Sequence, residues 1–352
     1  MRTLPCLMFP VAMAFAACGD SSHAAAESGA NQSGPATPNV FVSLDQEFSE
    51  PLLKRFATEL GFAIEQTHDT ENAKTVSLVG HISEERAHPR CSVYWNNELA
   101  NTVYLAEQGL LEPYESPSAA DVPAMWKDPQ HRWTAFAARA RILVVNTELL
   151  PDPSQWPTSY KDFVDPKWKG RCAVARPTTG TTLTHFTAMK KVLGDEAFEA
   201  WFAGMRAHDV QVLNSNGATL QAVREGQLAF AFTDTDDYHV AREKGFPVAC
   251  VFPDQHEGGI GTMLIPNSVA LIKNGPAPAK AKQLIDKILS RQTEALLAAG
   301  DSAQLPLRSG IPAPNDPGIK PAGAFKPMAW DIDWTAQNLA RCNAEFGKRL
   351  GM

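Results

Sequence analysis

The sequence predicts an α/β fold made of two lobes. Short apolar runs alternate along the chain with stretches of helical spacing, which is the pattern of strands covered by helices. About 310 residues follow a polar N-terminal stretch, enough for two lobes of ordinary domain size. A hydrophobic content of 44% is sufficient to fill their cores. The alternation also predicts that the sheets are mostly parallel.

Strands are predicted where short apolar runs lie between polar residues. They cover residues 39–43, 92–95, 141–145, 172–175, 228–232 and 268–272. Helices are predicted where apolar residues recur three or four positions apart. They cover residues 50–60, 98–108, 182–192, 195–207, 278–289 and 292–299. Gly61 and Gly109 mark the ends of the first two helices, and Pro278 suits a helix start.

The first residues have the layout of a secretory signal. Arg2 supplies a positive charge, and Leu4–Ala17 is an apolar run too short to span a membrane. The run ends in Phe-Ala-Ala-Cys-Gly, which resembles a bacterial lipobox with Cys18 as the lipidated residue, although Phe15 stands where Leu is usual. A lipoprotein signal peptide is therefore expected over residues 1–18. An ordinary signal peptide cleaved at a nearby alanine is the alternative.

Residues 19–39 are rich in Ser, Ala, Gly and Pro and are expected to form a flexible tether. No later segment is long and apolar enough to cross a membrane. We therefore expect a protein of the periplasm or cell envelope that is anchored only through its lipid.

Composition limits the partners. The net charge is −7 and no cluster of Lys and Arg stands out, which argues against nucleic acid. The folded part holds Cys91, Cys172, Cys250 and Cys342, at spacings that match no metal motif. A disulfide is the first expectation for an exported protein, and free buried thiols are the alternative.

Motifs at strand ends form an ordered series. They are Trp95–Glu98 with Gly109–Tyr114, Ala138–Arg141, Asp165–Arg171, Pro177–Thr182, Asn216 with Leu220–Val223 and Gly226, and Ala241–Gly245. In this order the chain, from about residue 39 to 310, resembles the periplasmic ferric-ion-binding proteins, which are extracellular solute-binding proteins of bacterial ABC importers.

The resemblance implies a type II periplasmic-binding-protein (Venus-flytrap) fold. Its N-lobe would comprise residues 40–140 plus 262–310 and its C-lobe residues 141–261, with crossover strands near 141–145 and 262–270. Residues 311–352 are left without a placement. The resemblance further implies a monomer that needs no obligatory cofactor and that delivers cargo to ABC permease and ATPase subunits.

The ferric site of these relatives uses a His, a Glu, two adjacent tyrosines and an anion. The resemblance places Asp45 at the His position, Glu98 near the Glu, and Thr235 and Asp236 at the tyrosines. Both tyrosines are thus replaced, and Tyr238 lies two residues beyond them as a weak substitute. The predicted metal ligands are Asp45, Glu98, Asp236 and Asp237.

Three carboxylates, those of Asp234, Asp236 and Asp237, directly follow an apolar strand. They repel one another unless a cation or solvent lies between them. Carboxylate oxygens are hard ligands that suit Fe³⁺, Mn²⁺, Ca²⁺ or Mg²⁺. The alternative is that they cap the following helix, whose N-terminus favours negative charge.

An anion site is predicted at another strand-to-helix junction, earlier in the chain. Its residues are Thr179, Gly180, Thr181 and Thr182, whose backbone N–H groups and hydroxyls suit an anion. In the ferric relatives the synergistic anion docks at this place. Arg139, Arg141 and Asn216 are expected to contribute. A plain helix cap beside a surface arginine is the alternative.

The sequence therefore predicts a binding protein for ferric iron or another hard cation with an anion. The alternative cargo is a small zwitterionic or phosphorylated organic solute, bound by the same two groups of opposite charge. A secreted hydrolase is the alternative from another class, since His185 and His239 lie near the same strand ends. No nucleophile-elbow spacing supports that hydrolase, so the chain is predicted not to be an enzyme.

Overall fold

The computed structural model describes residues 37–69 and 76–351. The expected signal peptide, Cys18 and most of the expected tether lie outside the described residues. Within them, no helix combines the length and apolarity needed to span a membrane. Cys91, Cys172, Cys250 and Cys342 are all free thiols, so the disulfide expectation was wrong. The alternative of free buried thiols holds for Cys91, Cys172 and Cys342, whereas Cys250 is half-buried.

The described strands join in the order β2-β1-β3-β10-β5-β8-β6-β7, with β4 paired to β10 and β9 paired to β5. Their bounds are β1 Asn39–Val42, β2 Glu65–His68, β3 Val93–Asn96, β4 Leu111–Glu112, β5 Thr134–Asn146, β6 Cys172–Ala175, β7 Gln211–Leu213, β8 Phe230–Asp234, β9 Val248–Val251 and β10 Leu264–Ile272.

The long strand β5 connects two sheets. Its first half, from Thr134 to Ala140, pairs with β10, and its second half, from Arg141 onward, pairs with β8 and β9. The first sheet thus contains β1 to β4 and β10, and the second contains β6 to β9. This strand is longer than the predicted run 141–145, because the alanines and Arg139 before Arg141 weaken its apolar signal.

The expectation of mostly parallel sheets was wrong. β1 pairs in parallel with β2 and β3, and β6 pairs in parallel with β7 and β8. Every pair made by β5 and β10 is antiparallel. The chain leaves the first sheet along β5 and returns along β10, so these two strands run against their neighbours.

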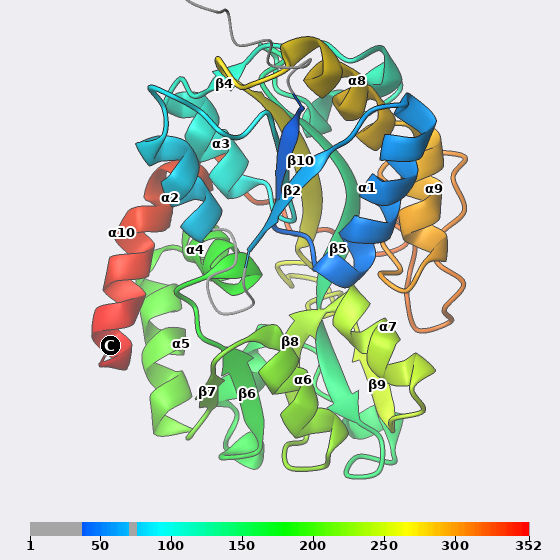
Figure 1. Ribbon diagram of the computed structural model, residues 1–352. Helices are drawn as coiled ribbons and strands as arrows, with labels where there is room; N and C mark the ends of the chain where they lie inside the picture. The colour runs from blue at the N-terminus through cyan, green and yellow to red at the C-terminus, as the bar shows by residue number, and fades with distance from the viewer. Residues whose placement is uncertain (1–36, 70–75, 352) are drawn as a thin grey trace, which may run out of the picture. The chain divides into compact units, whose positions relative to one another are not determined.

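The helices cover both sheets (Figure 1). Their bounds are α1 Gln46–Leu60, α2 Val76–Glu84, α3 Ala100–Glu107, α4 Gly180–Leu193, α5 Asp195–Ala207, α6 Asn216–Arg224, α7 Thr235–Glu243, α8 Pro278–Ile288, α9 Arg291–Ala299 and α10 Ile332–Leu350. Gly61 ends α1 in the left-handed conformation, with φ of 73°. α10 was not predicted.

Alternation along β5 fills a core on each face of the second sheet. Leu143 and Val145 belong to one buried cluster, which extends under the first sheet. Ile142 and Val144 belong to a second cluster with α6 and α7. Successive strand side chains point to opposite faces, so one apolar run supplies both cores. The fold class predicted from the sequence is therefore present, as two α/β lobes built on a shared strand.

Candidate ligand-binding site

A cavity of about 450 Å³ lies where strand ends and helix starts meet. It is lined by residues that follow β1, β3, β6, β7 and β8 and that open α1, α4, α6 and α7. Open α/β sheets place ligands beyond the carboxyl ends of strands. The lining residues are Asp45, Gln46, Glu47, Asn97, Arg139, Ala175, Arg176, Thr179, Gly180, Thr181, Thr182, Asn214, Ser215, Asn216, Gly217, Asp234, Asp236 and Asp237.

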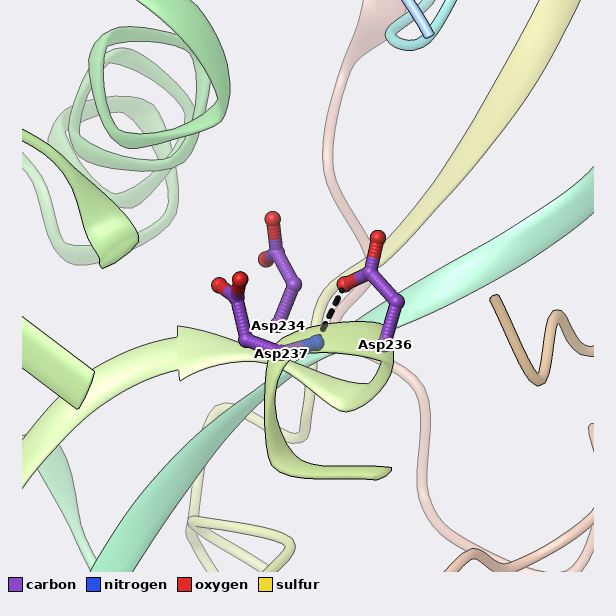
Figure 2. Close-up of side chains that lie close together, drawn as sticks. All are labelled: Asp234, Asp236 and Asp237. Atoms are coloured by element: carbon purple, nitrogen blue, oxygen red, sulfur yellow. Dashed lines mark hydrogen bonds between the residues drawn. The ribbon is translucent and has the colours of Figure 1, made fainter. Parts of the chain in front are cut away.

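The carboxylates of Asp234, Asp236 and Asp237 converge at the start of α7 (Figure 2). One oxygen from each lies within 4.8 Å of the others. The backbone N–H of Asp237 donates to Asp236 Oδ1 at 3.0 Å, which holds the two residues together. The predicted acidic group is thus assembled as three converging side chains.

Asp236 is the least compensated of the three. Its side chain is buried, and burial raises the pKa of its carboxyl well above the usual range. Arg139 opposes that shift, whereas the carboxylates of Asp237, Asp234 and Asp45 reinforce it. A cation placed among these oxygens would favour the ionised form of Asp236.

Asp234 forms the floor of the cavity. It accepts a hydrogen bond from Arg141 Nη1 at 2.8 Å, from Thr181 Oγ1 at 3.1 Å and from Asn216 Nδ2 at 3.1 Å. Burial opposes its ionisation, but Arg141 and Arg139, together with these hydrogen bonds, outweigh burial and lower its pKa. Asp234 is therefore a matched charge.

Arg141 does not line the cavity, because it is fully buried beneath it. Its guanidinium also donates to Thr181 and Thr182, each at 3.3 Å, and approaches His185 Nδ1 at 3.5 Å. Burial, and then the charge of Arg141, lower the pKa of His185 well below 6.5. His185 is thus a neutral core residue that packs on Phe232.

Arg139 faces the cavity with an unmet donor. It is 2% exposed, and its Nη2 donates to the backbone carbonyl of Asn97. Its Nη1 lies 3.7 Å from Asp236 Oδ2. Within the described residues, its Nε has no hydrogen-bond partner. A buried guanidinium donor without a partner is costly, and a ligand oxygen would satisfy it.

Helix starts supply further donors. α4 begins at Gly180, α6 at Asn216 and α7 at Thr235, and the first N–H groups of a helix lack partners within it. Gly180 has φ of 56°, a conformation that side chains with a Cβ rarely adopt. The predicted Thr-Gly-Thr turn thus lines the cavity beside the carboxylates, where an anion would meet helix N-termini.

Glu98 and Tyr238 do not line the cavity, although both were predicted as ligand residues. Glu98 is fully buried and accepts from the backbone N–H groups of Ala100 and Asn101 at 2.8 and 2.9 Å, so it caps α3. Tyr238 is buried against Gly318, where an added Cβ would clash with its hydroxyl. Both are held by internal packing instead.

Several lining residues were missed, among them Glu47, Asn97 and Arg176. Glu47 lies in a first helical turn that the predicted start of that helix, residue 50, excluded. Asn97 is the neighbour of Glu98 in the Trp-Asn-Asn-Glu run. Asn97 directly follows β3, and Glu47 lies at the start of the helix after β1. Their positions after strands could have identified both.

Comparison with known proteins defines the class. The family profile for bacterial extracellular solute-binding proteins matches residues 103–332. The chain is 24% identical over 314 residues to iron uptake protein A1 of Synechocystis, covering 86% of this chain and 84% of that protein. The chain therefore belongs to the bacterial extracellular solute-binding proteins, the class that serves ABC importers.

Solved structures share the fold. Iron-bound HitA from Pseudomonas aeruginosa superposes with a TM-score of 0.79 at 23% identity, over 89% of this chain and 100% of that one. AfuA from Actinobacillus pleuropneumoniae, a periplasmic binding protein solved with fructose-6-phosphate, gives a TM-score of 0.77 at 20% identity, over 90% and 99%. These likenesses confirm the predicted two-lobed periplasmic-binding-protein fold.

Proposed function

We propose that this protein captures a hard metal cation together with an oxyanion and delivers both to an ABC permease. The observation that carries the proposal is a cavity with adjoining groups of opposite charge. Asp236 and Asp237 lie on its acidic side, and Arg139 with an unmet Nε donor lies beside them.

The acidic side suits a hard cation. Asp45, Asp236 and Asp237 line one cavity and offer only oxygen ligands. Ferric iron is the first candidate, since one relative is named iron uptake protein A1 and HitA was solved in an iron-bound form. Among the residues that the structure describes, no tyrosine lines the cavity, so carboxylates alone would discriminate poorly between Fe³⁺ and other hard cations.

The donors that adjoin the acidic side suit the companion anion. Arg139 and the starts of α4 and α6 direct donors into the same space. A carboxylate or phosphate oxygen there would satisfy Arg139 and complete the coordination of the cation. Thr179, Gly180, Thr181, Thr182 and Asn216 therefore remain the proposed anion residues.

An organic cargo is the second candidate. A volume of about 450 Å³ falls in the range of small-molecule pockets. AfuA was solved with a phosphorylated sugar. A zwitterion would place its cationic end at Asp236 and Asp237 and its anionic end at the Thr-Gly-Thr turn.

The proposed setting is the periplasm or cell envelope, with Cys18 carrying the lipid anchor. The lobes would be residues 40–140 with 262–310 and residues 141–261. The chain would act as a monomer, without catalysis and without a permanently bound cofactor.

Thermal unfolding of the full chain against a ligand panel tests the proposal. The panel holds Fe³⁺ with citrate, Mn²⁺, Ca²⁺, 2-aminoethylphosphonate and fructose-6-phosphate. A ligand at about 100 times its dissociation constant adds about 2.7 kcal/mol to the free energy of unfolding. We expect a shift with a cation and its anion that is lost in Asp236→Asn.

The matched control is Asp209→Asn, which removes one exposed carboxylate outside the cavity. It should keep the full shift. A shift with an organic molecule alone would favour the second candidate. A cation shift that survives in Asp236→Asn would contradict the proposed site.

A further inference from the structure

A third arginine lies at the ligand cavity. Arg176 directly follows β6, is half-buried and lines the cavity, as Arg139 does. Arg139 lies 3.7 Å from the carboxylate of Asp236. Arg141, beneath the cavity, lies 2.8 Å from that of Asp234. Within the residues that the structure describes, Arg176 forms no ion pair, so of these three arginines it is the one whose charge the fold leaves unmatched.

The guanidinium of Arg176 is oriented by a neutral partner. Its Nη2 donates to Asn214 Oδ1 at 2.9 Å, and Asn214 follows β7, the last strand in the sheet order. A guanidinium carries five N–H donors, and this is the one hydrogen bond that it makes with the described residues. An amide oxygen fixes its position without neutralising it, so Arg176 keeps both its charge and most of its donors.

Arg139 is held in the other direction. Its Nη2 donates to the backbone carbonyl of Asn97, directly after β3 of the first sheet. In the sheet order, β8 lies between β5, which carries Arg139, and β6, which precedes Arg176. The two strands are therefore two strand spacings, about 10 Å, apart. Because their partners lie on opposite sides, at Asn97 and at Asn214, the two guanidiniums mark two separate ends of the cavity.

Helix starts line the cavity beside Arg176. α4 begins shortly after it, at Gly180, and α6 begins shortly after Asn214, at Asn216. The N-cap residue of α4, Thr179, makes no side-chain hydrogen bond that caps the helix. Within the described residues, the first backbone N–H groups of α4 thus lack a side-chain acceptor and suit an anionic group. Backbone donors therefore accompany Arg176 at its end of the cavity.

We propose that the companion anion is an organic acid with two separated acidic groups, and that Arg176 binds the distal one. The proximal group, beside Asp236 and Asp237, binds the cation and satisfies the unmet Nε of Arg139. An anion with a single acidic group would occupy that end alone and leave Arg176 to solvent. This inference rests on the proposed function for the cation, whereas the contact of Arg176 with the acid needs no metal.

Matched pairs of 2-hydroxy acids test the inference in the full chain. 2-Hydroxyglutarate and 2-hydroxypentanoate have equal carbon chains and the same chelating hydroxycarboxylate, but one ends in a carboxylate and the other in a methyl group. Malate and 2-hydroxybutanoate form the corresponding shorter pair. Titration calorimetry measures each acid with Fe³⁺ and without it. In at least one pair we expect the diacid to bind about 10-fold more tightly than the monoacid, because only the diacid reaches Arg176. Equal affinities within both pairs would overturn the proposal.

Variants then change the guanidinium. Arg176→Gln should weaken the diacid about 10-fold and leave the monoacid within about twofold, so that the preference disappears. Arg176→Lys keeps the charge without the planar fork and should retain part of the preference. Asn214→Asp supplies Arg176 with a carboxylate of its own in the empty protein and should reduce the preference as well. A preference that survives Arg176→Gln contradicts the proposal.

The matched control is Arg171→Gln. Arg171 directly precedes β6, is exposed and lies outside the cavity, so the variant removes the same charge at the opposite end of the same strand. It should keep the parental preference for the diacid. A loss equal to that of Arg176→Gln would assign the effect to overall charge and overturn the proposal.

The series without Fe³⁺ separates this inference from the proposed function. A diacid preference that depends on Arg176 but does not respond to Fe³⁺ would support the inference and contradict the proposed cation site. Fe³⁺ that strengthens the diacid and the monoacid to the same affinity would support the cation site and overturn the inference. Failure of all four acids to bind, with Fe³⁺ or without it, would also overturn it.

Discussion

The floor of the ligand cavity, at Asp234, and the wall formed by the start of α7, at Asp236, each pair a buried aspartate with an arginine. The aspartate of the floor is well compensated by its arginine, and the aspartate of the wall is not. On the floor, Asp234 lies 2.8 Å from Arg141 and accepts two further hydrogen bonds. On the wall, Asp236 lies 3.7 Å from Arg139, which keeps an unmet donor. The pKa of Asp234 is lowered and that of Asp236 is raised, although only Thr235 separates them.

This difference separates structure from binding. A matched buried pair is costly to break but offers little to a ligand, since its hydrogen bonds are already made. An unmatched carboxylate destabilises the empty protein and regains that free energy when a cation arrives. We therefore assign the floor to the fold and the wall to the cargo.

The largest effect is expected on the floor. Asp234→Ala leaves the fully buried Arg141 without its carboxylate, so the free energy of unfolding should fall by about 3–5 kcal/mol. Urea unfolding at neutral pH measures the loss. Asp236→Ala should change the free energy of unfolding far less. A loss below about 1 kcal/mol for Asp234→Ala would mean that the pair of Asp234 and Arg141 contributes no more than an ordinary surface ion pair. The distinction between a structural floor and a binding wall would then be wrong.

A substitution in the wall, at Asp236, should change the free energy of unfolding in the opposite direction. Asp236 has a raised folded-state pKa, so its contribution to stability is fully present below the usual pKa of 3.8 and is lost as pH rises through the folded value. Asp236→Asn removes that loss and should raise the unfolding free energy of the empty protein at pH 7 by about 1 kcal/mol. Urea unfolding of both proteins from pH 4 to 8 measures the difference, which should grow with pH.

Cation binding by the wall should depend on pH in the complementary way. A proton and a metal ion compete for the Asp236 carboxylate, so affinity for Mn²⁺ or Fe³⁺ should rise with pH. Asp236→Asn should weaken binding at least about 10-fold and flatten this dependence. Titration calorimetry at two pH values distinguishes the cases, and a variant with parental affinity would remove Asp236 from the site.

A smaller effect is expected at His185, below the floor. Its folded-state pKa is depressed, so its contribution to stability is present above pH 6.5 and is lost as pH falls toward the folded value. The parent chain should therefore lose up to about 1.4 kcal/mol per pH unit below 6.5 relative to His185→Leu. The exposed control His256→Gln should follow the parent chain, and parallel profiles for His185→Leu would contradict the assignment.

The sequence predicted most elements of the fold, because its apolar runs are short and sharply bounded. β6 and α5 match their predicted ranges. β2, β7 and β9 were not predicted, since runs such as Glu65–His68 are polar and only partly buried at a sheet edge. The direction of pairing was also missed, because an apolar run carries no information about whether its neighbour runs with it or against it.

The site was predicted through position and not through contact. Residues after strands, such as Asp45 and Asp236, were expected to gather at one place, and the structure puts both in the lining of one cavity. The sequence could not show that Glu98 turns inward to cap α3, because a carboxylate at a helix start suits a cap or a ligand equally well. It also could not separate Arg139 from Arg141, which alternate-residue geometry places on the same side of the strand.

The smallest effect concerns Thr182, which was predicted as a ligand residue and lines the cavity. Its hydroxyl already accepts from Arg141 at 3.3 Å and contacts Asn216 at 3.2 Å, as a floor residue would. Thr182→Val should lower the free energy of unfolding by about 1 kcal/mol, because the arginine keeps its other partners. Cargo affinity should stay within about twofold of the parent value if the hydroxyl serves the floor alone. A loss of affinity without a loss of stability would show that the Thr182 hydroxyl binds cargo. The first turn of α4 would then contain both residues that support the fold and residues that bind the ligand.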